Sequence, residues 1–158
     1  MERLEHDDNR EMNMDSLFPA IDTDKTIKNC KHFLAVTFPA MVRTSGKSVS
    51  DLKSPTVDDM PRQTSSDNGI ERRIYQRLYA EQVVRRTIEA ISHCSETSKQ
   101  VLSYLYLDEY TDTMCYMSIG YSRSHYFDHV KPAALLEFAD AYLLDDLHVL
   151  KEGEHNEI

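Results

Sequence analysis

Apolar residues recur every three or four positions in several stretches of the chain, and this spacing predicts amphipathic helices. The first stretch follows Asp22, Thr23 and Asp24, any of which can cap a helix. Its apolar positions are Ile27, Cys30, Leu34, Phe38 and Met41. Pro39 is expected to kink or end this helix, and Gly46 follows it.

A second, longer helix is predicted from residue 70 to residue 91. Its apolar face consists of Ile74, Leu78, Val84, Ile88 and Ile91. Its other face carries Arg72, Arg73, Arg77, Arg85 and Arg86. Two interpretations of these arginines stay open: they contact phosphates, or they form an ordinary solvated face.

Three shorter helices are predicted towards the C-terminal end. Ser95 is positioned to cap one that turns Val101, Leu102 and Leu105 inward. Thr111 can cap the next, "DTMCYMSI", which is expected to bury Met114, Met117 or Ile119. Gly120 then supplies a tight turn, and Ser122 caps the last helix, in which Phe127 and Val130 are expected to face the core. No stretch alternates with the period of two typical of strands, so the predicted fold class is all-α.

These elements predict the following organisation. An N-terminal helical segment at 16–46 follows a disordered arm at 1–15. A linker rich in Ser, Asp, Thr and Pro, residues 47–69, separates it from a second helical domain at 70–147. That domain contains a helix-turn-helix at 111–131, and an acidic tail at 148–158 closes the chain.

The helix beginning at Ser122 carries the side chains best suited to reading bases. Arg123 in a first turn can donate two hydrogen bonds to a guanine. Ser124, His125 and Tyr126 can reach bases or phosphates. Spacing alone does not separate a DNA-reading helix-turn-helix from an ordinary pair of packed helices, so both interpretations remain at this point.

The overall negative charge of the chain argues against binding to nucleic acid, but the charge is not evenly distributed along the sequence. The formal net charge is -9, and from Ser95 onward four basic residues stand against twelve acidic ones. Within that part, however, residues 122–131 carry a net charge of +1, and much of the acid lies beyond them. Fewer basic side chains release fewer counterions, so we expect weak DNA binding with modest salt dependence.

The segment "IGYSRSHYFDHVKPAALLEFADAY", residues 119–142, resembles the ArpU family of phage transcriptional regulators, which are also called autolysin regulators and grouped with RinA. The segments "LFPAIDTDKTIKNCKHFL", "FPAMVRTSG", "DLKSPTVDDMP", "RLYAEQVV" and "AISHCSETSKQVL" are similar to that family in the same order. The resemblance implies an N-terminal helical part and a helix-turn-helix similar to the DNA-reading region of sigma factors. It also implies binding to double-stranded DNA near phage or prophage late promoters, with control of packaging and lysis genes.

The resemblance assigns the base-reading positions to Tyr121, Ser122, Arg123, Ser124, His125 and Tyr126, and backbone contacts to His129 and Lys131. The sequence departs from the family at "KPAALL", where many relatives are more basic and where Pro132 is expected to interrupt the helix or to restrict Lys131 before it. A homodimer or host RNA polymerase is the expected source of additional affinity.

Other chemistry receives little support from the sequence. Three distant cysteines, Cys30, Cys94 and Cys115, fit reduced thiols. His125 and His129 have the spacing of two zinc ligands, but no third ligand is placed, so neither a metal nor a cofactor is expected. No phosphate-binding glycine loop or nucleophile motif is present, and we expect no enzyme.

No apolar run is long enough to span a membrane, and the polar N-terminal residues do not resemble a signal peptide, so a bacterial cytoplasmic location is expected. Two other functions stay open. One is a small terminase-like packaging adaptor that forms a ring, and the other is an RNA polymerase-binding module that does not read DNA.

Overall fold

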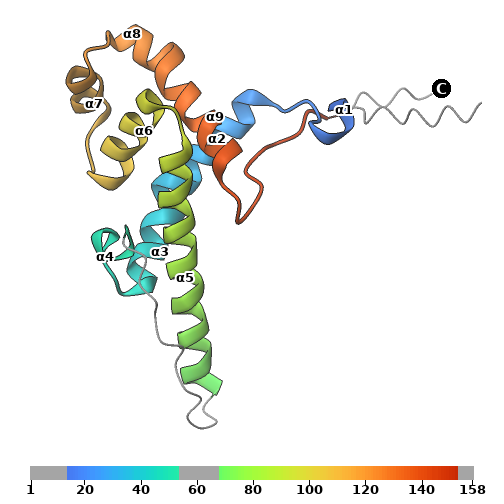
Figure 1. The fold of residues 1–158 in the computed structure, drawn as a ribbon, viewed down its shortest axis with the longest axis vertical. Helices are drawn as coiled ribbons and strands as arrows, with labels where there is room; N and C mark the ends of the chain where they lie inside the picture. Colours follow the sequence, from blue (N-terminus) through green and yellow to red (C-terminus); the bar gives the residue numbers. More distant parts are fainter. Residues whose placement is uncertain (1–13, 54–67, 153–158) are drawn as a thin grey trace, which may run out of the picture.

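The structure, a computed structural model, describes residues 14–53 and 68–152, and helix dominates these ranges (Figure 1). The only pairing of extended backbone within them is an isolated antiparallel bridge between Ile21 and Leu150. The all-α prediction is therefore confirmed. The α-helices are α1 (Met14–Leu17), α2 (Thr23–His32), α3 (Phe38–Ser45), α4 (Val49–Lys53), α5 (Asn68–His93), α6 (Glu96–Leu102), α7 (Asp112–Ile119), α8 (Arg123–His125) and α9 (Lys131–Ala141). Three π-helical turns, Phe33–Thr37, Ser103–Leu107 and Tyr126–Val130, continue or join them.

Pro39 and Pro132 do not end their helices, so the end allowed for at Pro39 and the interruption expected at Pro132 are not seen. Helix continues through Pro39 to Ser45, and through Pro132 to Ala141. Each proline follows a π-helical turn, in which the residue before the proline donates its N–H to a carbonyl five residues back: Phe38 to Phe33 and Lys131 to Tyr126. The wider turn accommodates the proline ring, which would otherwise crowd a carbonyl one turn earlier.

The predicted ends of the first helix are confirmed. Asp22 is the cap, because its carboxylate accepts a hydrogen bond from the N–H of Lys25 at 3.0 Å. At the other end Gly46 adopts a left-handed conformation, with φ of 68°, that side chains disfavour. Cys30, Leu34 and Phe38 are buried, as the spacing predicted.

Helix α5 is the longest helix of the described chain, and only its C-terminal half is buried. Val84 and Ile91 lie in the core, whereas Ile74 and Leu78 of the same predicted apolar face are exposed. Every residue from 68 to 79 is exposed. The N-terminal half extends beyond the rest of the molecule (Figure 1).

The N-terminal helices and the C-terminal helices share one core. A single cluster joins Cys30 and Leu34 of the N-terminal segment to buried residues of α5, α6, α7 and α9. At its centre the ring of Phe138 lies 5.9 Å from Phe33 and 5.5 Å from Tyr142, measured between ring centroids. The predicted division into an N-terminal segment and a separate DNA-binding domain is therefore not reflected in the packing.

The predicted linker at 47–69 begins with ordered structure. Val49–Lys53 forms α4, whose Leu52 is buried in a second cluster with Phe38 and Val84. The backbone carbonyl of Leu52 accepts a hydrogen bond from Arg85 of α5 at 3.3 Å. Residues 54–67 of the predicted linker lie outside the described ranges.

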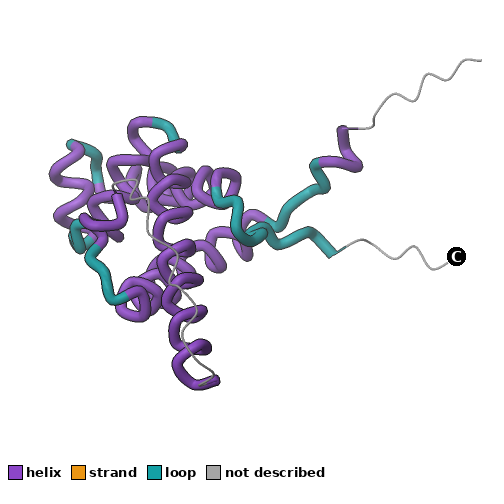
Figure 2. The backbone as a smooth tube through the Cα atoms, turned by 60° about the horizontal axis from the view of Figure 1, so that its bottom comes forward, coloured by secondary structure: helices purple, strands orange, loops and turns teal. Residues whose placement is uncertain are grey.

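The segment after α9 packs against the N-terminal end of the chain, and Figure 2 shows the two terminal segments running side by side. The N–H of Asp22 donates to Val149, the N–H of Lys151 donates to Ala20, and Leu147 is buried. The predicted tail is thus ordered as far as residue 152, while residues 153–158, like residues 1–13 of the predicted arm, lie outside the described ranges.

A histidine fastens this segment to α9. The ring nitrogens of His148 lie 2.7 Å from carboxylate oxygens of Asp140 and Asp146. Burial alone would lower the pKa of His148, but these hydrogen bonds and charges raise it above its ordinary value.

None of the helices in the described ranges combines the length and the apolar character needed to cross a membrane.

Candidate nucleic-acid interface

The helix, turn and helix predicted at residues 111–131 are all present. Thr111 caps α7, since its hydroxyl accepts a hydrogen bond from the N–H of Met114 at 3.2 Å. Gly120 ends α7 with φ of 89°, and the N–H groups of Gly120 and Tyr121 both donate to the carbonyl of Tyr116. This paired bonding is the pattern of a glycine-terminated helix, and it fixes the direction in which the next helix starts.

Helix α8 starts at a cap that is also a predicted base-reading residue. The hydroxyl oxygen of Ser122 accepts a hydrogen bond from the N–H of His125 at 3.2 Å. That oxygen keeps its own hydrogen free to donate to a phosphate or base. The side chains of Arg123, Ser124 and His125 are exposed, so the first turn presents polar groups to solvent.

Three rings line one part of this exposed surface. The ring of His125 lies 5.1 Å from that of Tyr121 and 5.4 Å from that of His129, between centroids. Tyr121 is half-buried and His129 exposed. The predicted residues that the structure brings together in solvent are therefore Tyr121, Ser122, Arg123, Ser124, His125 and His129.

Tyr126 is not available to read bases, which corrects the sequence prediction. Its side chain is 0% exposed, and its ring packs on Tyr116 at 5.5 Å between centroids. Its hydroxyl donates a hydrogen bond to Asp112 at 2.7 Å. Tyr126 instead fixes the helix that starts at Ser122, the candidate reading helix, to the first turn of α7.

Lys131 is likewise an internal residue and not a contact to the DNA backbone. It is 8% exposed, and its ammonium group donates to the same Asp112 oxygen at 2.7 Å. The positive charge of Lys131 is thus compensated inside the protein. Asp112, Tyr126 and Lys131 form what we call the anchor of the reading helix.

Phe127 was predicted to face the core and is instead 40% exposed on the reading surface. The guanidinium of Arg123 and the ammonium group of Lys131 each lie 5.8 Å from the centre of its ring. Cations over a ring face are attracted by its electrons, so Phe127 helps to position Arg123. Apolar side chains at such a surface can also contact the methyl group of thymine.

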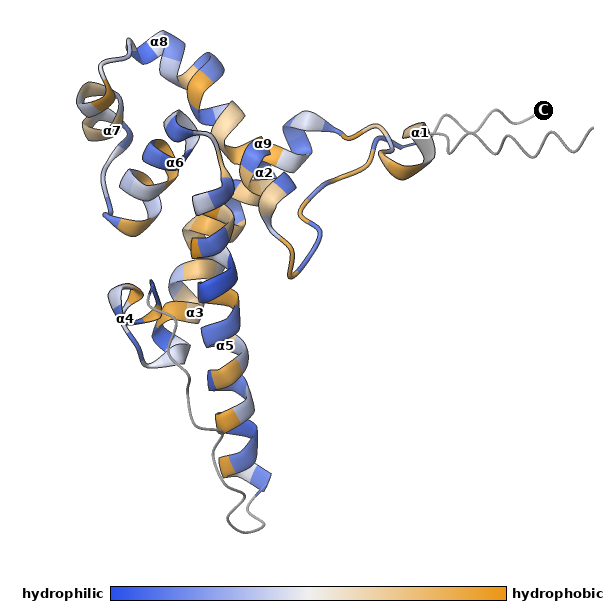
Figure 3. Ribbon diagram, viewed as in Figure 1, coloured by the Kyte–Doolittle hydropathy of each residue, from blue (hydrophilic) through white to orange (hydrophobic). Residues whose placement is uncertain are grey.

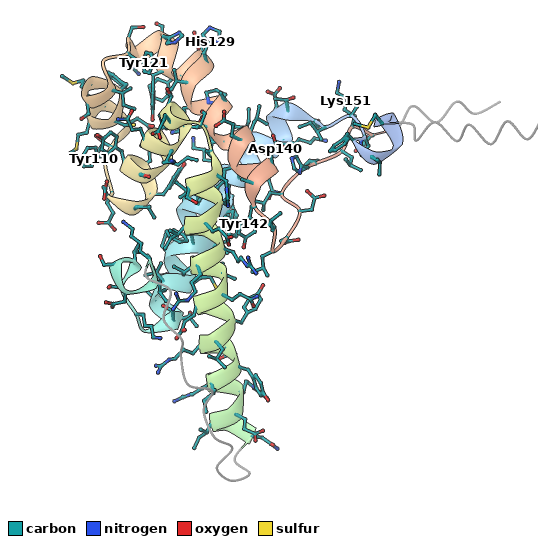
Figure 4. All side chains as sticks on the ribbon, viewed as in Figure 1. Tyr110, Tyr121, His129, Asp140, Tyr142 and Lys151 are labelled. Carbon is teal, nitrogen blue, oxygen red and sulfur yellow. The ribbon has the colours of Figure 1, made fainter. Side chains whose placement is uncertain are left out.

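The exposed reading surface is close to neutral. With Lys131 paired to Asp112, Arg123 and the exposed Asp128 are the remaining formally charged residues of the segment 122–131. Figure 4 places Tyr121 and His129 at one end of the molecule, away from Asp140 and Lys151. The exposed Lys31 of α2 is not among the contact residues predicted from the sequence, and its charge contributes to lowering the pKa of Asp112. Only the packing of α2 beside α9 reveals it.

The arginines of α5 do not enlarge this surface. Arg86 pairs with Glu89 at 3.0 Å, Arg85 donates to Leu52, and the guanidinium of Arg77 lies against Gly46. The exposed half of α5 lies at the opposite end of the molecule from α8 (Figure 1). A phosphate contact by these arginines would therefore involve a different surface.

Asp112 makes the anchor sensitive to acid. Burial alone would raise the pKa of Asp112, but the hydrogen bonds from Lys131 and Tyr126 hold it below its ordinary value of 3.8. A carboxylate with a depressed pKa stabilises the fold above its unfolded pKa, and this contribution is lost as pH falls through the lower, folded pKa.

We expect Asp112→Asn to lower the free energy of unfolding at pH 7, and the difference from the wild type to shrink as pH falls below 3.8. Urea unfolding followed by circular dichroism at pH 7 and at acid pH measures this difference. Asp128→Asn, a change to an exposed carboxylate on the same helix, is the control and should alter stability little at either pH. A difference for Asp112→Asn that did not depend on pH would contradict the assigned role of the charge.

The cysteines of the described chain are buried, and its histidines belong to no convergent set of metal-ligating side chains. The three cysteines are free and buried, and burial raises the pKa of the Cys30 thiol to about 12. No group of three or more His, Cys, Asp or Glu side chains in the described ranges converges as metal ligands do.

Ser95 was predicted to cap α6. Its hydroxyl instead donates a hydrogen bond to Glu137 at 3.0 Å, and its side chain does not cap the helix.

The fold and this surface define an all-helical protein whose helix, tight turn and helix present a polar first turn to solvent. Comparison with known proteins adds a relative that bears the name autolysin regulatory protein ArpU, from Enterococcus hirae. It is 30% identical to this chain over 128 residues, which cover 80% of the chain and 92% of the relative. The chain belongs to the ArpU family. No protein-family model matches it, and no solved structure matches it significantly.

Proposed function

We propose that this protein binds double-stranded DNA through the first turn of the helix that starts at Ser122 and thereby regulates transcription. The observation that carries the proposal is the exposure of Arg123, Ser124 and His125 on a helix whose buried side is anchored to α7. A reading helix needs this combination, because base contacts require side chains that reach outward from a fixed backbone. The regulatory name of the Enterococcus hirae relative supports the same role.

The proposed targets are sites near phage or prophage late promoters that control packaging and lysis genes, as the family resemblance implies. We infer that the chain acts by binding and not by catalysis, since its thiols are buried and the residues of the reading surface resemble no catalytic arrangement. The near-neutral surface predicts modest affinity, in which base contacts matter more than long-range attraction.

Arg123→Ala should weaken binding to the specific site by about 1 to 3 kcal/mol and reduce discrimination against unrelated DNA. Retention of labelled late-region fragments, with unrelated DNA as competitor and at two salt concentrations, measures both effects. Arg72→Ala is the matched control, because Arg72 is exposed on α5 at the far end from α8. If Arg123→Ala bound as tightly and as selectively as the wild type, the role given to Arg123 would be wrong.

A second candidate function is an interaction module that binds RNA polymerase without reading DNA. The observation in its favour is charge: residues from Ser95 onward carry twelve acidic and four basic residues, and Lys131 is compensated internally. Two results separate the two functions. An interaction module would retain no late-region DNA when polymerase is absent. Arg123→Ala would leave the complex of such a module with polymerase unchanged.

A further inference from the structure

The exposed half of α5, residues 68–79, carries an apolar stripe that the neighbouring helix α3 covers only in part. Ile70, Ile74 and Leu78 are four residues apart, so they lie on one side of the helix, and all three are exposed. Figure 3 shows this apolar character persisting to the end of α5 that projects from the molecule. A projecting helix with exposed isoleucines and leucine is a common form of protein interface.

The residues beside the stripe differ between its two sides. Successive helical residues are separated by about 100°. Arg73 and Arg77, each one residue before a stripe position, therefore border one side. Glu71, Tyr75 and Tyr79, each one residue after a stripe position, border the other. One border is basic, and the other is acidic and aromatic.

This asymmetry selects a partner and a direction. When two copies of such a helix pack side by side in parallel, each basic border meets the partner's acidic and aromatic border, which allows ion pairs and cation–π contacts. In an antiparallel pair, like borders meet and arginines face arginines. The stripe itself is self-complementary in the parallel arrangement, since each apolar residue lies beside its own counterpart across a two-fold axis.

We propose that the chain forms a parallel two-fold dimer through residues 70–79 of α5. The contact lies at the end of the molecule opposite α8, so both reading helices would lie at the same end of the dimer and remain free (Figure 1). Reading two half-sites with this dimer rests on the proposed function, but the self-association does not. The stripe is short, so the dimer should be weak and should form as protein concentration rises.

Sedimentation of the full-length protein without DNA tests the proposal. The mass should rise with concentration from 18.3 kDa towards twice that value. Ile74→Glu places two carboxylates against each other at the two-fold axis and should weaken self-association by about tenfold or more. Gln76→Glu, on the opposite side of the same helix, is the matched control and should dimerise like the wild type, and circular dichroism should show both variants folded.

The charges test the direction. Glu71→Arg should weaken a parallel dimer, because the basic border then meets a basic one. Combining it with Arg73→Glu and Arg77→Glu exchanges the borders and should restore association. In an antiparallel dimer through residues 70–79, Glu71 would lie near Tyr75 and Tyr79 of the second copy, so Glu71→Arg would introduce no repulsion and should leave association intact.

Three results would overturn the proposal: a monomer at every concentration, an Ile74→Glu variant that still dimerises, or a ring of many copies, which would favour a packaging adaptor. If the wild type stayed monomeric while Ile74→Glu reduced DNA retention, the stripe would contact DNA or another protein and not a second copy. Because the mass is measured without DNA, a failure of the dimer is distinguishable from a failure of the DNA-binding function.

Discussion

Tyr126→Ala should lower the free energy of unfolding by about 3 to 5 kcal/mol, among the largest effects expected for a single change in this chain. The side chain is the largest of the fully buried ones, so its removal leaves a cavity between α7 and the reading helix. It also removes the hydroxyl that donates to Asp112 at 2.7 Å. Under the proposed function, specific DNA binding should fall with stability, because the helix that starts at Ser122 loses its attachment to α7.

Tyr126→Phe separates the two contributions. It keeps the ring and removes only the hydroxyl, so it should cost about 1 to 2 kcal/mol. Phe127→Ala is the matched control: the neighbouring ring is 40% exposed, and its loss should change stability by less than about 1 kcal/mol. Urea unfolding followed by circular dichroism ranks the three variants. If Phe127→Ala were the more destabilising alanine variant, the inward orientation of Tyr126 would be wrong.

Phe127 was predicted to lie in the core and Tyr126 at the surface, and the structure shows the reverse. This difference shows which part of the site could not be predicted from the sequence. Both aromatic residues lie at helical spacing from Val130, one at four residues and one at three, so periodicity allows either to face the core. The choice depends on Asp112, fourteen residues away, whose carboxylate accepts a hydrogen bond that only the tyrosine can donate. The caps at Thr111 and Ser122 and the turn at Gly120 were predictable because each depends on a few neighbouring residues.

The same distinction between local and distant causes applies to the fold. The helical class, the cap at Asp22 and the end at Gly46 follow from local sequence. The exposure of Ile74 and Leu78 does not, because it depends on where the neighbouring helices stop along α5. Helix continues past Pro39 and Pro132 because a π-helical turn upstream, which no simple pattern signals, accommodates each ring.

Phe138→Ala should also destabilise the protein by about 3 to 5 kcal/mol, and it tests whether the helices form one cooperative unit. Phe138 is fully buried in α9, and its ring contacts Phe33 of the N-terminal helical run and Tyr142 after α9. A cavity at this position would remove contacts between α9 and the N-terminal helical run, which lie about a hundred residues apart in sequence. Leu143→Ala, at an exposed position nearby, is the control and should be close to neutral.

Hydrogen exchange provides the readout that distinguishes one unit from two. In a shared core, Phe138→Ala should reduce the protection of α2 and of α9 by similar factors, because both open in the same cooperative step. Loss of protection confined to α9, with α2 unchanged, would show that the N-terminal helices fold independently of the reading region. The shared cluster that includes Cys30, Leu34 and Phe138 favours the first result. In that case, under the proposed function, a change in the N-terminal helices would alter DNA binding without touching the proposed interface, since the helix that starts at Ser122 and α2 depend on the same packing.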